Sequence, residues 1–101
     1  MTPRLVRFTA TARRHVLREE AWWVENRVHI DTFANELEDA LRLVALLPAA
    51  GSAYAQAGVA GLRRMYVQKI DCHLYYTFDE RQVVVRALWG ARKRSGPRLK
   101  G

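Results

Sequence analysis

The sequence has a single cysteine, and this scarcity excludes a framework of intramolecular disulfide bonds. A lone thiol is typical of a reducing compartment. The first residues lack an apolar run of signal-peptide length, and no segment approaches the ~18 consecutive apolar residues that a membrane span needs. Repeats, linkers and low-complexity stretches are also missing. We therefore expect a cytoplasmic protein without a membrane segment, folded as one domain over residues 1–101.

The lone cysteine, Cys72, has no neighbour in the sequence that would activate it except His73. Adjacent residues of a strand point their side chains to opposite faces, so this pair cannot act together. We predict a thiol that is packed or lies in a turn, without a catalytic role. The chain also has no cysteine quartet of the kind that binds a metal, and we expect neither a metal nor a cofactor.

Acidic residues are few, because ten Asp and Glu stand against seventeen Lys and Arg, which gives a net charge of +7. Residues 90–101 contain no acid and five basic residues, Arg92, Lys93, Arg94, Arg98 and Lys100. Such a basic tail, from about residue 91, can bind phosphate or an acidic protein segment. Because Arg92 follows a predicted strand and a glycine, we expect it to belong to a site. For Arg98 and Lys100 we expect a solvated, frayed end.

Three predicted strands fill the last third of the chain, over residues 62–70, 73–78 and 82–89. In the first, Met65 and Val67 fall on one face and polar residues alternate with them, which is the period-two pattern of a half-buried strand. The second strand alternates in the same way. The third is rich in β-branched residues, as is typical of the middle of a sheet.

Two predicted helices occupy the middle of the chain. In the first, from about residue 11 to 28, four apolar residues recur at helical spacing. They are Leu17, Ala21, Val24 and Val28. The second helix can be capped by Asp31 or Thr32, carries a continuous apolar stripe and ends at Pro48. A connection as short as residues 26–31 requires the helices to lie antiparallel and to pack together on the sheet.

The chain resembles the RelE/ParE superfamily, the toxins of type II toxin–antitoxin modules. Three features of the last third carry the resemblance: the run His-Leu-Tyr-Tyr-Thr-Phe-Asp-Glu from residue 73, a Val-rich strand, and the run Ala-Leu-Trp-Gly-Ala-Arg-Lys-Arg from residue 87. The resemblance covers nearly the whole chain, beginning with a strand at residues 5–9. It implies an α+β fold with an N-terminal strand, an antiparallel helical hairpin and a three-stranded antiparallel meander that joins the first strand in one sheet. It also implies a hetero-oligomer with a cognate antitoxin.

The polar face of the predicted sheet supplies the candidate site. Seven side chains would project from the face opposite the helices, namely Arg64, Tyr66, Gln68, His73, Tyr75, Thr77 and Arg86. Arg92 would leave the end of the sheet nearby. For RNA, such a basic groove would supply phosphate contacts, a stacking ring and one histidine that titrates near neutrality.

The ribonuclease branch of the family implies roles in catalysis for four residues, His73, Arg64, Arg86 and Arg92. In that branch a base activates a ribose 2′-hydroxyl and cationic groups hold the phosphate. His73 stands where that branch commonly has an arginine, and Arg92 matches the arginine after its last strand. However, residues 95–99 contain no tyrosine, which that branch carries in its tail. The long hairpin helices and the missing tyrosine make the chain more similar to the ParE branch, whose members inhibit DNA gyrase by protein contact and have no hydrolytic site.

Three functions remain open at this point, with the ParE-like gyrase inhibitor favoured. The second is a RelE-like mRNA interferase that acts with the ribosome, and the third is a basic nucleic-acid-binding module without toxicity. Nine residues are candidates for binding the antitoxin, gyrase or RNA: Arg64, Tyr66, Tyr75, Arg86, Arg92, Lys93, Arg94, Trp22 and Trp23.

The three tryptophans have different predicted places. Adjacent residues of a helix point about 100° apart, so we expect one of Trp22 and Trp23 in the core and the other at the rim of the hairpin. There it can anchor a partner or pack on the edge of the sheet. Trp89 shares its predicted face with three apolar residues of its strand, Val83, Val85 and Ala87. We expect Trp89 in the core.

Overall fold

The computed structural model describes residues 2–26, 29–56, 58–93 and 95–99. The elements follow one another as β1 (Leu5–Phe8), α1 (Ala10–Asn26), α2 (Ile30–Leu46), the 3-10 turn η1 (Pro48–Ala50), β2 (Ser52–Ala53), β3 (Arg63–Val67), the 3-10 turn η2 (Gln68–Ile70), β4 (Cys72–Phe78) and β5 (Gln82–Gly90). The predicted α+β order of strand, helical hairpin and meander is confirmed. No helix in these ranges is both long enough and apolar enough to span a bilayer.

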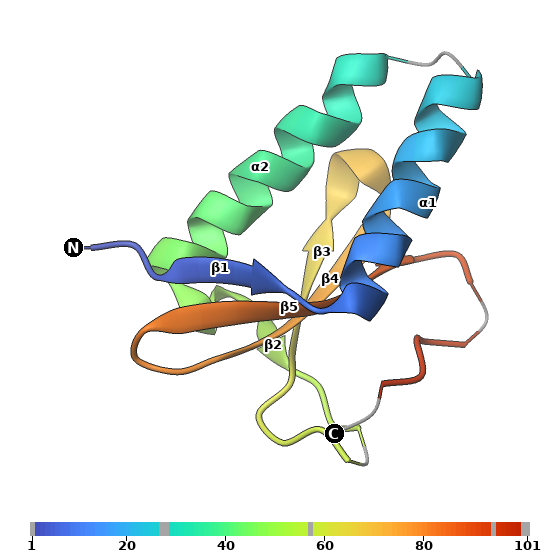
Figure 1. The fold of residues 1–101 in the computed structure, drawn as a ribbon. Helices are drawn as coiled ribbons and strands as arrows, with labels where there is room; N and C mark the ends of the chain where they lie inside the picture. The colour runs from blue at the N-terminus through green and yellow to red at the C-terminus, as the bar shows by residue number, and fades with distance from the viewer. Residues whose placement is uncertain (1, 27–28, 57, 94, 100–101) are drawn as a thin grey trace.

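The strands form one five-stranded mixed sheet in the order β1-β5-β4-β3-β2. β1 pairs with β5 in parallel, because the hairpin of α1 and α2 carries the chain across before the meander begins (Figure 1). The other neighbours are antiparallel. The short strand β2 was not predicted, since its two small residues sit in a loop of alanine, glycine and serine. It places Ser52 opposite Arg64 and so brings the loop after α2 to the sheet.

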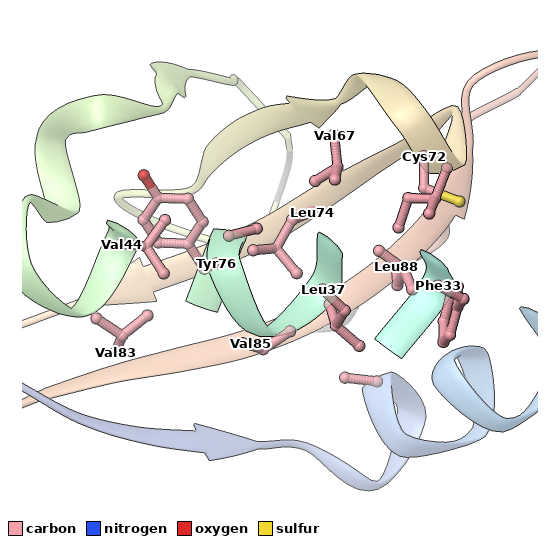
Figure 2. Close-up of a cluster of buried hydrophobic side chains, with 13 residues drawn as sticks. Phe33, Leu37, Val44, Val67, Cys72, Leu74, Tyr76, Val83, Val85 and Leu88 are labelled. Carbon is pink, nitrogen blue, oxygen red and sulfur yellow. The ribbon is translucent and has the colours of Figure 1, made fainter. Parts of the chain in front are cut away.

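The main core lies between the helices and one face of the sheet. The stripe on α2 packs onto β4 and β5 as its spacing predicted, with Phe33, Leu37 and Val44 among the buried residues (Figure 2). The sheet contributes Leu74, Tyr76, Val83, Val85 and Leu88, each fully or almost fully buried. Burying a side chain of this size contributes about 1.5–3 kcal/mol, so this layer supplies most of the stability of a small domain.

Helix α1 does not bury the apolar stripe that its sequence predicts. Leu17 and Val24 are 63% and 52% exposed, and Ala21 is exposed between them. Val28 lies outside the described residues. The buried face of α1 instead carries Ala12 and His15. The helix crosses close to β5, where a methyl group fits and the His15 Nδ1 accepts a hydrogen bond from the Leu88 N–H at 3.3 Å.

An irregularity between β4 and β5 reverses the predicted faces of the last strand. Tyr75 pairs with Ala87, whereas the next residue, Tyr76, pairs with Val85, so Arg86 is an extra residue in β5. A bulge of this kind shifts the side-chain alternation by one position. Trp89 therefore does not share a face with Val83 and Val85. Its predicted place in the main core is wrong, and it packs partly buried in a second cluster on the opposite face. The buried members of that cluster are Val59, Leu62, Tyr75 and Ala87.

Candidate functional site

The face of the sheet opposite the helices carries a small concavity, which we name the aromatic pocket. Its volume is about 200 Å³. It is lined by residues of three strands and of the segments that precede β3 and follow β5: Tyr54, Arg64, His73, Tyr75, Trp89, Gly90, Ala91, Lys93, Ser95 and Gly96. The predicted meeting of Arg64, His73 and Tyr75 on this face is confirmed. Tyr54 was missed.

His73 lies half-buried near the start of β4, paired with Tyr66 of β3 and Trp89 of β5. Its ring centroid is 5.3 Å from that of Tyr66 and 6.2 Å from that of Tyr75. Burial, followed by the positive charge of Arg64, lowers the pKa of His73 from its ordinary value of 6.5. The imidazole is therefore neutral at pH 7 and able to accept a proton.

Arg64 stands over an aromatic pair. Its guanidinium carbon is 4.6 Å from the ring centroid of Tyr54, whose ring in turn meets that of Tyr75 edge-on at 5.3 Å. Burial raises the pKa of Tyr75, which keeps the phenol neutral. The pairing of β2 with β3 and the hydrogen bond from the Tyr54 N–H to the Leu62 carbonyl bring Tyr54 to Arg64. No local pattern around Tyr54 indicates this pairing, which is why sequence reasoning missed it.

The segment 95–99 is docked on this face, contrary to the expectation of a frayed end. The Trp89 indole N–H donates to the Ser95 carbonyl at 2.7 Å, and the Gln56 side-chain amide donates to the Pro97 carbonyl at 2.8 Å. Gly96 lies so close that a Cβ atom there would stand 3.3 Å from the Tyr54 hydroxyl. The segment therefore forms one wall of the aromatic pocket. Lys100 and the predicted partner residue Arg94 lie outside the described residues.

The structure separates two of the predicted cationic residues from the aromatic pocket. Arg86 donates from Nε to the Thr77 hydroxyl at 2.9 Å and lines a different pocket. Arg92 is 94% exposed in its side chain and pairs with Asp71, Nε to Oδ2, at 2.9 Å. The other carboxylate oxygen of Asp71 accepts a hydrogen bond from the Tyr66 hydroxyl at 2.7 Å, which raises the pKa of Tyr66. Arg92 thus reaches His73 only through this chain of contacts.

Another hollow, the hairpin groove, lies between α1 and the end of the sheet and has a volume of about 530 Å³. Its lining residues are Glu19, Trp22, Trp23, Lys69, Ile70, Asp71, Gly90, Arg92 and Lys93. Trp23 packs against the core and Trp22 is 53% exposed at the rim, so the predicted division of the two indoles is confirmed. The groove joins apolar walls to three cationic side chains.

Cys72 lies buried beneath this groove. Its thiol donates to a carboxylate oxygen of Glu19 at 3.2 Å, and burial, then this hydrogen bond, raises its pKa far above its ordinary value. It is a packed thiol, as predicted, and stays protonated at neutral pH. Across the described ranges, no three His, Cys, Asp or Glu side chains come together in a way that could hold a metal ion.

No protein-family model matches the sequence. No curated protein matches it either. Solved structures do match. A chain of the chromosomal ParDE toxin–antitoxin system from P. aeruginosa has a TM-score of 0.67 at 8% identity, over 88% of this chain and 97% of that one. A chain of the RelBE2 toxin–antitoxin complex from Mycobacterium tuberculosis has a TM-score of 0.61 at 23% identity, over 88% and 99% of the two chains.

A chain of the DinJ-YafQ toxin–antitoxin complex from E. coli has a TM-score of 0.63 at 13% identity and covers 94% of this chain and all of that one. At these identities the likeness establishes the fold. The protein has the RelE/ParE toxin fold, with two helices on a mixed sheet, as the resemblance of its sequence implied.

Proposed function

We propose that the protein is the toxin of a type II toxin–antitoxin module and is held inactive by a cognate antitoxin. One observation carries the proposal: the shared fold spans 88% to 94% of this chain, and each of the three neighbours comes from a toxin–antitoxin complex or system. One fold can host unrelated functions, so the proposal also needs a surface that suits an antitoxin. The helical hairpin supplies one.

The outer face of α1 exposes a row of apolar side chains. Leu17 is 63% exposed, Val24 is 52% exposed, and Ala21 lies one turn from each on the same face of the helix. Soluble monomers rarely leave contiguous apolar surface in water, and such patches mark interaction sites. An amphipathic antitoxin segment laid along α1 would bury this row.

The hairpin groove continues this surface toward the sheet. Trp22 offers an aromatic anchor. Of the three cations that line the groove, Lys69 pairs with Glu36 and Arg92 with Asp71, whereas Lys93 forms no ion pair with the described residues. The net charge of +7 would draw an acidic segment toward the protein. We therefore place the antitoxin along α1 and in the hairpin groove, with its acidic side chains near Lys93.

We further infer that the toxin acts on DNA gyrase by protein contact, as in the ParE branch. The support is that the four residues named for RNA cleavage do not converge. His73 and Arg64 share the aromatic pocket, whereas Arg86 lines another pocket and Arg92 is paired with Asp71. Cleavage requires its acid, base and cationic groups within hydrogen-bond reach of one phosphate.

The second candidate function is ribosome-dependent mRNA cleavage, as in the RelE branch. It is favoured by His73, whose neutral imidazole lies beside Arg64 in a pocket ringed by aromatic side chains. In this alternative His73 accepts the proton of a ribose 2′-hydroxyl, Arg64 holds the phosphate, and the rings stack on bases.

One pair of assays separates the two functions. The purified protein is added to gyrase with supercoiled plasmid, and to ribosomes translating a defined mRNA. We expect stabilised gyrase–DNA cleavage complexes, intact mRNA, and the same gyrase result with His73→Ala. Cleavage of the mRNA in the ribosomal A site that is lost in His73→Ala would instead establish the RelE-like function.

A further inference from the structure

The pocket that Arg86 lines, which we name the arginine pocket, lies where β1 leads into α1. Its volume is about 400 Å³. The lining residues come from the start of α1, from β5 and from the docked tail: Thr9, Thr11, Arg14, Arg86, Arg98 and Leu99. The bulge in β5 makes Arg86 the extra residue of its strand. Bulges often re-aim a side chain in this way, and the toxin proposal above leaves this residue without a role.

The pocket gathers positive charge without a counter-charge. Three of its six lining residues are arginines and none is acidic. All ten acidic residues belong to the described ranges, and in those ranges none of them forms an ion pair with Arg14, Arg86 or Arg98. Guanidinium groups stay protonated at any physiological pH, so an anion bound among them would relieve their mutual repulsion.

Two of the arginines are held in place by neutral partners. Arg86 donates from Nε to the Thr77 hydroxyl at 2.9 Å, and Arg14 donates from one Nη to the Thr11 hydroxyl at 3.1 Å. Neither bond neutralises charge, and within the described ranges both guanidinium groups keep further N–H donors without a protein acceptor. Fixed forks of N–H donors match the oxygens of a phosphate.

We propose that the arginine pocket binds backbone phosphates of a single-stranded nucleic acid. Leu99 is its single fully apolar side chain, so it offers little to a peptide, which needs apolar burial as well as charge. Ser95 and Gly96 line the aromatic pocket, and Arg98, two residues after Gly96, lines the arginine pocket. Two residues of extended chain span at most about 7 Å, so the two pockets lie close together along the tail. A nucleic-acid strand whose phosphates are bound in the arginine pocket can therefore stack a base near the aromatic pocket.

The test uses purified protein alone and therefore does not depend on the toxin proposal. The probe is a fluorescein-labelled 12-nucleotide 2′-O-methyl RNA, with binding followed by fluorescence anisotropy between 50 and 300 mM KCl. The test variant carries Arg14→Gln, Arg86→Gln and Arg98→Gln. The matched control carries Arg13→Gln, Arg42→Gln and Arg81→Gln, which remove the same charge from exposed residues outside the pocket.

Each phosphate contact on a single strand contributes about 0.7 to the slope of log K against log salt. We expect the test variant to lose about 2 from that slope and at least about tenfold in affinity at 50 mM KCl, and the control to lose less than about 0.7 from the slope. Because Arg98 is exposed and lies in the tail, Arg98→Gln alone leaves the fold intact and should lower the slope by about 0.7.

Equal losses in the test and control variants would overturn the proposal, since the effect would then follow net charge alone. So would native protein that fails to bind the RNA. Two competitors identify other ligands. Inorganic pyrophosphate that binds in an arginine-dependent way while the RNA does not would assign the pocket to a free phosphate compound. A 12-residue polyglutamate that depends on the same arginines, and displaces the RNA at equal concentration, would assign it to an acidic protein segment.

Discussion

The Tyr76 hydroxyl holds the loop after α2 against the sheet, and its removal tests how the site is positioned. Tyr76 is fully buried in β4. Its hydroxyl donates to the Pro48 carbonyl at 2.6 Å and accepts from the Gly51 N–H at 2.9 Å. Both bonds fix the segment that leads into β2, and β2 carries the chain to Tyr54 in the aromatic pocket.

Tyr76→Phe removes only the oxygen atom and leaves two buried backbone groups without partners. An unsatisfied buried group costs about 1–3 kcal/mol, so we expect the free energy of unfolding to fall by about 2–4 kcal/mol. In a domain of this size 1 kcal/mol corresponds to roughly 4–8 °C, and the melting temperature should fall by about 8–32 °C. Gly51→Ala tests the same contact from the other side, because its Cβ atom would stand 2.5 Å from the hydroxyl.

The measurement is thermal and urea unfolding followed by circular dichroism. Tyr66→Phe is the control, because its hydroxyl is exposed and donates to Asp71, so its loss should cost less than about 1 kcal/mol. If Tyr76→Phe unfolds within about 0.5 kcal/mol of the native protein, the hydroxyl does not anchor the loop, and the described path from α2 to Tyr54 is wrong.

Three further predictions follow. Burial is the largest cause that lowers the pKa of His15 and of His73 from 6.5, so as the pH falls the unfolded chain protonates these two histidines before the folded protein does. The free energy of unfolding, measured by urea titration, should therefore fall as the pH drops below about 6.5. In His15→Gln it should fall less steeply. Cys72 should react with Ellman's reagent only when the protein unfolds, and rapid native labelling would contradict its burial. Trp22→Ser should weaken antitoxin binding at least about tenfold by calorimetry with little change in melting temperature, whereas Leu5→Ser, also exposed, should not.

Alternation of side chains predicted the faces of β3 and β4, but it failed within β5. The run from Val83 to Trp89 is apolar on both faces apart from Arg86, so no change in alternation marks the bulge. Arg86 is identified as the extra residue only because its neighbours Val85 and Ala87 pair with consecutive residues of β4. Apolar spacing likewise predicted α1 as a helix but chose the wrong buried face, because the close approach to β5 favours Ala12 over the larger Leu17.

The candidate site was predictable where it depends on neighbouring strands and not where it depends on distant loops. His73, Arg64 and Tyr75 meet because β3 and β4 form a hairpin of adjacent strands. The docked tail depends on contacts such as that between Gln56 and Pro97, which are 41 residues apart. A Ser-Gly-Pro segment reads locally as a loop, and no local pattern indicates where a loop packs.

The central claim is that the protein is a toxin, and growth under induced expression tests it most directly. The gene is expressed in bacteria with and without its neighbouring reading frame, beside the same plasmid carrying a stop codon at Arg4. The account predicts growth arrest by the chain alone, and normal growth when the neighbour's product is made with it and purifies as its complex. Normal growth with the chain alone, at a confirmed level of soluble protein, would contradict it.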